Sequence, residues 1–338
     1  MVGLSDRRAP ASGYAIAPVS RRHALTALTL SPALFWPGLL LAKGYPLRVD
    51  RVRFLGLAAA PASGALAVGE RGVIARLPAG ANGWTLQRLA TRESLTACAL
   101  RDDGLALAVG HGGAAFRSED SGASWQPLAS ALDPVNPNRD PWLSVFVGRR
   151  GGLWLMGGFG LLAYSEDGAK TWVRLTPMEP DFDRHLYGMA EILEGGFLLL
   201  GESGSLAESF DGREWKERVS PYDGSWFGGL QTAAGSLLAF GMRGQIFRRA
   251  GGQSQWTAAE GPSVTHGWVH GAQLQNGQVV LVGGQGMAAV SGDDGRRFEL
   301  KRLWDGHLSG ICQDARERVW ISGTQGIRGF DSQWRPLT

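Results

Sequence analysis

The sequence predicts an all-β fold, a seven-bladed β-propeller of four-stranded antiparallel blades. The pattern Gly-x-x-Gly recurs at residues 69/72, 110/113, 157/160, 201/204, 241/244, 283/286 and 323/326. Successive pairs lie 40–47 residues apart, which is close to the length of one propeller blade. Each pair follows an apolar run and precedes a second strand-like run, so each pair marks a tight hairpin.

Two further strands complete each unit. Another apolar segment precedes each glycine pair, at residues 52–58, 95–100, 142–147, 186–193, 226–231, 268–274 and 308–313. A fourth strand begins near an aromatic residue late in the unit, and four short antiparallel strands describe one blade. Seven such units fill residues 45–338, which leaves no room for a second domain.

A serine–aspartate motif lies between the third and fourth strands of the units. The pattern Ser-x-Asp-x-Gly-x-(Ser/Thr)-Trp fits closely at 118–125, is good at 165–172, is shortened at 209–215 and ends in Phe at 291–298. Short polar side chains bond turn amides, so we expect structural turns, with each aromatic packing onto its own unit. The residues are Ser118, Asp120, Trp125, Ser165, Asp167, Trp172, Ser209, Asp211, Trp215, Ser291, Asp293 and Phe298.

Residues 1–42 differ from the rest of the chain. Arg21 and Arg22 precede an apolar run over residues 24–42, which is typical of an export signal of the twin-arginine type. An uncleaved membrane anchor is the alternative. The export signal predicts a periplasmic or otherwise extracytoplasmic location.

The charge balance gives no support to a nucleic-acid role. The chain holds 34 basic and 31 acidic residues, and residues 1–42 contain four arginines and one aspartate. The remaining 30 basic and 30 acidic residues balance, whereas nucleic-acid binding needs a basic surface. Cys98 and Cys312 fall in units that are not neighbours, so we expect two buried thiols rather than a disulfide.

The glycine turns share one face of the predicted disc with the connections between units, and the serine–aspartate turns lie on the opposite face. We call these the glycine-turn face and the box face. Histidines and aromatics gather on the glycine-turn face, as on recognition surfaces. The predicted partner-binding residues are Trp142, His185, Tyr187, Trp226, Arg243, Trp268 and His270. The alternative is that the large aromatics pack between blades. No catalytic residue, metal or cofactor is predicted.

The glycine turns and box motifs, repeated after an export signal, resemble the photosystem II stability/assembly factor propellers, a group of BNR or Asp-box repeat proteins. The resemblance implies a non-catalytic factor that holds a newly made membrane-protein subunit, partly through an arginine patch. The partner would be a membrane or envelope protein, and the location the thylakoid lumen in a photosynthetic host. The arginine before the box serine is kept at Arg76, Arg117 and Arg248, and replaced by Tyr164, Glu208, Val290 and Phe330 elsewhere.

A carbohydrate-active propeller is the alternative function, because Asp boxes also occur in sialidases. It would be a sialidase-like glycoside hydrolase or a glycan-binding module. The early [FY]-R-I-P segment of sialidases has no match here, where the chain reads VRFLGLAAAP. Paired carboxylates for glycoside hydrolysis would come from Glu179, Asp181 and Asp183. A scaffold with a small molecule in its channel is a third reading.

Overall fold

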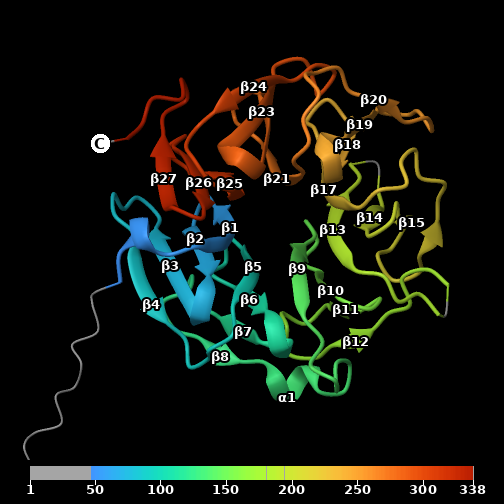
Figure 1. The fold of residues 1–338 in the computed structure, drawn as a ribbon. Helices are drawn as coiled ribbons and strands as arrows, with labels where there is room; N and C mark the ends of the chain where they lie inside the picture. The colour runs from blue at the N-terminus through green and yellow to red at the C-terminus, as the bar shows by residue number, and fades with distance from the viewer. Residues whose placement is uncertain (1–46, 180, 194, 338) are drawn as a thin grey trace, which may run out of the picture. The chain divides into compact units, whose positions relative to one another are not determined.

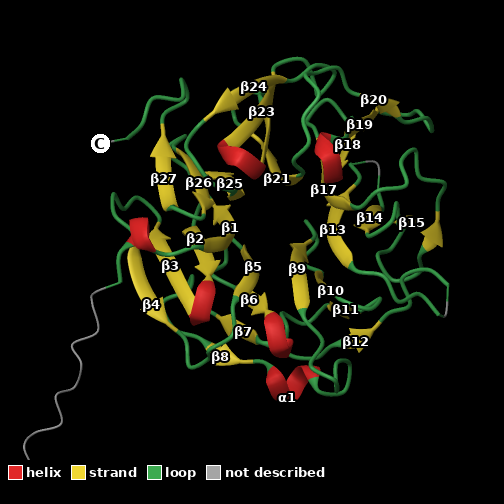
Figure 2. Cartoon of the chain, viewed as in Figure 1, coloured by secondary structure: helices red, strands yellow, loops and turns green. Residues whose placement is uncertain are grey.

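The computed structural model describes residues 47–337 except positions 180 and 194, and these residues form seven antiparallel sheets in a ring (Figure 1). Strands dominate and the helices are short (Figure 2). The predicted seven-bladed propeller is therefore confirmed. The predicted export segment, residues 1–42, lies outside the described residues. No helix in the described part of the chain has the length and hydropathy needed to cross a membrane.

Each sheet is built from consecutive strands, ordered from the ring axis outward. The innermost strands are β1 (Phe54–Ala60), β5 (Leu95–Leu100), β9 (Trp142–Val147), β13 (Leu186–Glu191), β17 (Trp226–Gln231), β21 (Trp268–Gln273) and β25 (Leu308–Gln313). The second strands are β2 (Gly64–Gly69), β6 (Ala106–Gly110), β10 (Leu153–Gly157), β14 (Phe197–Gly201), β18 (Leu237–Gly241), β22 (Val279–Gly283) and β26 (Val319–Gly323). The third strands are β3 (Val73–Pro78), β7 (Ala115–Ser118), β11 (Leu162–Ser165), β15 (Leu206–Ser209), β19 (Ile246–Arg249), β23 (Met287–Ser291) and β27 (Gly326–Phe330).

The outermost strands are short and mostly exposed. They are β4 (Thr85–Arg88), β8 (Gln126–Pro127), β12 (Val173–Arg174), β16 (Lys216–Glu217), β20 (Thr257–Ala258) and β24 (Glu299–Arg302). In the seventh sheet, a bridge between Phe330 and Pro336 takes the place of the fourth strand. The helix α1 (Ala129–Leu132) lies in the loop between β8 and β9. The 3-10 turns are η1 (Val49–Arg51), η2 (Glu70–Gly72), η3 (His111–Gly113), η4 (Met242–Gly244) and η5 (Gly284–Gly286).

The two glycines of each pair meet different constraints. The second glycine, such as Gly244 with φ +70°, takes the left-handed conformation that the hairpin needs. The first glycine is extended, with φ −174° at Gly241. A Cβ atom on Gly241 would lie 2.2 Å from the carbonyl oxygen of Ser225. The end of the second strand is thus pressed against the start of the innermost strand, and only glycine permits that approach.

The core is divided into seven apolar clusters, one between each pair of adjacent blades. The cluster that joins the last blade to the first contains Phe54 and Trp320. Ser309 Oγ also donates to the Phe54 carbonyl at 2.7 Å. Because every described sheet contains only consecutive strands, the ring closes through side-chain packing and hydrogen bonds and not through an exchanged strand.

The box aromatics pack into the interface with the preceding blade. Trp125 of the second blade lies against the cluster that holds Leu66 of the first blade, and Trp172 of the third blade belongs with Leu107 of the second. We expected each aromatic to pack onto its own unit, but it packs between its own blade and the preceding blade. Because the turn is short, its aromatic side chain packs into the apolar cluster between its own sheet and the sheet of the preceding blade.

The arginines before the box serines join neighbouring blades in the same direction. Arg76 Nε donates to the Ser121 carbonyl at 2.9 Å, and Arg117 Nε donates to the Gly168 carbonyl at 2.7 Å. Arg248 Nε makes the equivalent bond to the Asp294 carbonyl at 2.8 Å. These three arginines therefore link the first, second and fifth blades to the turn of the blade that follows, and they form no common patch.

The box serines and aspartates close their own turns. Ser118 Oγ donates to Asp120 Oδ1 at 2.7 Å, and the Gly122 amide donates to Ser118 Oγ at 2.9 Å. The amide and hydroxyl of Ser124 both donate to the Asp120 carboxylate. Although desolvation opposes it, this set of hydrogen bonds lowers the pKa of Asp120 to about 2.

We predict that Gly241→Ala destabilises the fold by about 2 kcal/mol or more, because the added methyl meets the Ser225 carbonyl. Thermal and urea unfolding measure the change in the free energy of unfolding. Gly292→Ala is the matched control, since a Cβ at Gly292 meets nothing within 4 Å. Equal stability of the two variants would contradict the close-approach argument.

We predict that Asp120→Asn lowers stability at pH 7 by about 1 kcal/mol, a value that allows for solvent screening of this exposed carboxylate. The folded pKa lies below the unfolded value of 3.8, so the stabilisation is present above pH 4 and is lost as the pH falls toward 2. Unfolding free energies measured from pH 7 to pH 2 should converge for the two proteins. Glu299→Gln, an exposed change on β24 outside the box turns, is the control for removing a surface carboxylate.

Candidate binding site at the axial cavity

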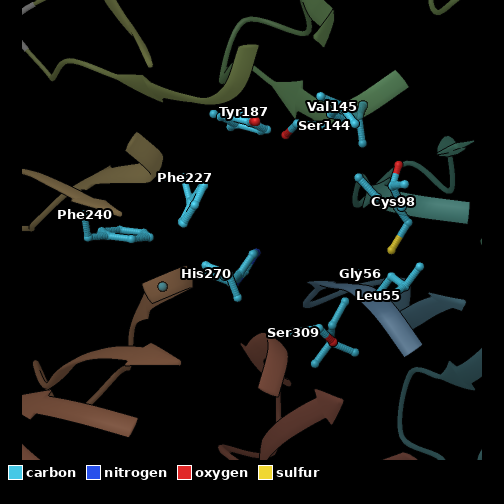
Figure 3. Close-up of a pocket in the computed structure, with 18 of the residues that line it drawn as sticks. Leu55, Gly56, Cys98, Ser144, Val145, Tyr187, Phe227, Phe240, His270 and Ser309 are labelled. Carbon is cyan, nitrogen blue, oxygen red and sulfur yellow. The ribbon is translucent and has the colours of Figure 1, made fainter. Parts of the chain in front are cut away.

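A cavity of about 590 Å³ lies on the ring axis, and the innermost strands of all seven blades line it (Figure 3). It opens on the glycine-turn face, because Gly284 and His307 of that face belong to its wall. In the described part of the chain, no Asp, Glu, Lys or Arg lines the cavity. The wall is mostly apolar, with a few hydroxyl groups and imidazoles. A cavity of this size and polarity suits an organic ligand or a piece of a peptide.

A β-bulge near the start of every innermost strand shapes the cavity wall. In each blade the pairing register shifts between the first and third residues of the innermost strand. A bulge re-aims the side chain of the extra residue. The residues at this bulged position are Leu55, Thr96, Leu143, Tyr187, Phe227, Val269 and Ser309. They form the first ring of side chains around the axis, and Figure 3 shows Tyr187 and Phe227 beside the cavity.

His270 is the exception in the second ring. The equivalent residues of the other blades are Gly56, Ala97, Ser144, Gly188, Gly228 and Gly310. His270 Nδ1 accepts a long hydrogen bond from the Ile311 amide at 3.4 Å. Burial in the cavity wall lowers the pKa of His270 to about 4. The imidazole of His270 is therefore neutral at pH 7.

An aromatic track leads from the surface of the glycine-turn face to the cavity. It consists of Phe159, His185, Tyr187 and Phe227. Successive ring centroids are 5.2, 6.0 and 5.4 Å apart, and each pair is T-shaped. Phe159 is 55% exposed at the outer end, and Phe227 lines the cavity at the inner end. The track thus joins solvent-exposed apolar surface to the cavity.

Glu202 lies beside the track. Its carboxylate accepts a hydrogen bond from the His185 amide at 3.1 Å and lies 3.7 Å from His185 Nδ1. Burial and the nearby Glu202 charge raise the pKa of Tyr187, so its hydroxyl stays protonated. Burial likewise raises the pKa of the Cys98 thiol in the cavity wall to about 12. Cys98 is therefore unreactive, and both cysteines are free and buried, as expected.

Of the seven predicted partner-binding residues, four lie in the track, the cavity wall or an exposed turn of the glycine-turn face, and three are buried between blades. His185 and Tyr187 belong to the track, His270 lines the cavity, and Arg243 lies in an exposed turn of the same face. Three predicted contacts are corrected, because their side chains are only 0–1% exposed: Trp142, Trp226 and Trp268. Each is the first residue of an innermost strand, where other blades carry Phe or Leu in the interblade clusters.

Sequence reasoning missed Phe159 and Phe227. Phe159 lies inside a Gly-x-x-Gly pair, which draws attention to its turn and away from its side chain. Phe227 follows Trp226 directly, and the sequence does not show that the bulge turns one ring inward and the other outward. A signal for Phe159 was available, because the equivalent turn positions hold Arg71, Gly112, Ser203, Arg243, Gln285 and Gln325.

The structure gives the carboxylates proposed for glycoside hydrolysis no part in the cavity. Glu179, Asp181 and Asp183 are exposed in the loop between β12 and β13, and none of them lines the cavity. Among the described residues, no group of three His, Cys, Asp or Glu side chains is arranged to hold a metal ion.

Comparisons with known proteins find likeness in structure alone. No family profile and no curated protein matches the chain. YCF48 bound to a D1 peptide matches with a TM-score of 0.64 and 16% identity, over 82% of this chain and 91% of that one. YCF48 from Cyanidioschyzon merolae matches with a TM-score of 0.67 and 14% identity, over 85% and 98%. A virginiamycin B lyase from Staphylococcus aureus matches with a TM-score of 0.70 and 11% identity, over 82% and 94%. At these identities the likeness establishes the propeller fold.

Proposed function

We propose that this chain is a non-catalytic, exported propeller that binds a protein partner on its glycine-turn face and assists the assembly or stability of a membrane or envelope complex. The aromatic track carries the proposal. Exposed aromatic side chains that continue into a concave pocket are the usual anchors of protein recognition. The resemblance of the repeat motifs to photosystem II assembly factors supports a role in the assembly of a membrane complex.

Phe159 is the strongest single observation. Its backbone is left-handed, with φ +56°, a conformation that costs a bulky residue about 1 kcal/mol. The six equivalent turn positions named above carry glycine or polar residues. An exposed aromatic held in a strained conformation favours neither solubility nor stability, so it supports a binding role.

Two other features support the wider proposal. The arginine pair and apolar run within residues 1–42 favour export, which would place the propeller beside envelope proteins. YCF48, one of the similar structures, was solved with a D1 peptide bound. We extend from that protein only the general role, because the arginines kept in this chain join blades together.

We predict that Phe159→Asn reduces partner capture about tenfold or more while the fold becomes equally or more stable, because asparagine tolerates the left-handed backbone. A photo-cross-linking amino acid at position 243, on the same face, reports capture in living cells of the source organism. The yield of cross-linked adducts is read from denaturing gels, and thermal unfolding reports stability.

Gln285→Asn is the matched control, since Gln285 has φ +58° in the equivalent turn of another blade. It should leave the adduct yield unchanged. A second cross-linker at position 210, on the box face, should give few adducts although Phe210 is 85% exposed. Equal yields from positions 210 and 243, or a yield from position 243 that is insensitive to Phe159→Asn, would refute the proposed face.

A further inference from the structure

We infer that the partner segment carries a bulky apolar residue flanked by Lys or Arg, and that the apolar residue enters the axial cavity while the basic residues face the acidic rim. This inference rests on the proposed function, since it specifies the chemistry of the same site.

The cavity selects for an apolar side chain. Its wall holds no permanently charged group among the described residues, and His270 is neutral at pH 7. A charged side chain placed there would lose its hydration without finding a partner. An apolar residue that slides from Phe159 along the track to Phe227 stays in contact with aromatic surface throughout. The apolar part of the segment therefore belongs in the cavity.

The cavity favours a peptide over a hydrocarbon chain. Every innermost strand is an edge strand, so no neighbouring strand pairs the backbone groups on its axial side. Side chains bond some groups of these strands, such as the Phe54 carbonyl and the Ile311 amide. A lipid tail that displaced water from the others would leave them unsatisfied, at about 1–3 kcal/mol for each buried group. A peptide brings its own amides and carbonyls to this wall. The occupant that satisfies both the apolar side chains and the backbone is a peptide segment.

The rim of the cavity supplies negative charge. Acidic residues outnumber basic ones in the turns and loops of the glycine-turn face. The acidic residues are Asp50, Glu70, Glu93, Asp133, Asp140, Glu179, Asp181, Asp183, Glu202, Asp223, Glu260 and Asp305. The basic residues are Arg48, Arg51, Arg53, Arg71, Arg92, Arg139, Arg184, Arg218 and Arg243.

Two of these acids lie in or beside the glycine turn of the fourth blade, which carries part of the track. Glu202 approaches His185, and Asp223 packs beside the same glycine turn, with its Cα 3.2 Å from where a Cβ on Gly204 would stand. Lys or Arg beside the apolar residue would complement these charges, whereas Asp or Glu would be repelled.

A panel of labelled nine-residue peptides tests the inference by fluorescence anisotropy at physiological salt. Each peptide carries a central Leu-Phe pair flanked by Lys, by Ser or by Glu, and a fourth peptide is Lys-flanked around Ser-Ser. The Lys-flanked Leu-Phe peptide should bind about tenfold more tightly than the Glu-flanked one. It should also bind about tenfold more tightly than the Ser-Ser peptide. Equal binding of the Lys- and Glu-flanked peptides, or of the Leu-Phe and Ser-Ser peptides, would overturn the inference.

Variants locate the binding. Ser144→Phe fills the cavity from β9 and Val269→Trp fills its mouth from β21, so each should weaken the Lys-flanked peptide at least tenfold with the melting temperature unchanged. Glu202→Gln removes a rim charge but keeps an acceptor for the His185 amide, and should narrow the preference for Lys over Glu. Phe210→Ser on the box face is the control and should change nothing.

Several outcomes separate this inference from the proposed function. Peptide binding that survives both cavity-filling variants, with adducts still formed from position 243, would overturn the inference and leave the proposed function standing. Loss of the adducts as well would defeat both. Uptake of the fluorescent fatty acid cis-parinaric acid by the wild type and not by Ser144→Phe, with no peptide bound, would assign the cavity to a lipid and overturn the inference.

Discussion

The packing of each blade against the one before it is the interaction on which the structure depends. Every interface holds its own apolar cluster, and the box aromatic of one blade reaches into the cluster shared with its predecessor. Three arginines repeat that link through hydrogen bonds to the neighbouring turn. The last blade meets the first in the same way, through Phe54 and Trp320. Closure therefore follows from repeating one interface seven times.

The axial cavity is a consequence of the same geometry. Because the first glycine of each pair lets the second strand press against the start of the innermost strand, every innermost strand begins with a bulge. The bulge separates two adjacent side chains. The first, such as Trp226, turns into the interblade cluster, and the second, such as Phe227, turns toward the axis. Consecutive residues of one short segment thus line the interblade cluster and the axial cavity.

This alternation explains what the sequence could and could not predict. The glycine period predicted the blade count, the strand order and the two faces, because glycine is required wherever backbones approach closely. It also placed His185, Tyr187 and His270 on the glycine-turn face. Trp142, Trp226 and Trp268 were misassigned because the local register of a bulge, which decides the side each ring faces, leaves no mark in a single sequence. Phe159 lay in a turn whose pattern is defined by its glycines.

The central claim is that a protein partner is held on the glycine-turn face, over the aromatic track. Hydrogen-exchange mass spectrometry, with and without the partner identified by cross-linking, tests it most directly. The account predicts that the partner slows amide exchange in residues 157–160 and 185–189, around the track and the wall of the axial cavity. Slowed exchange confined to the box turns at residues 119–125 and 166–172, with the track unchanged, would contradict it.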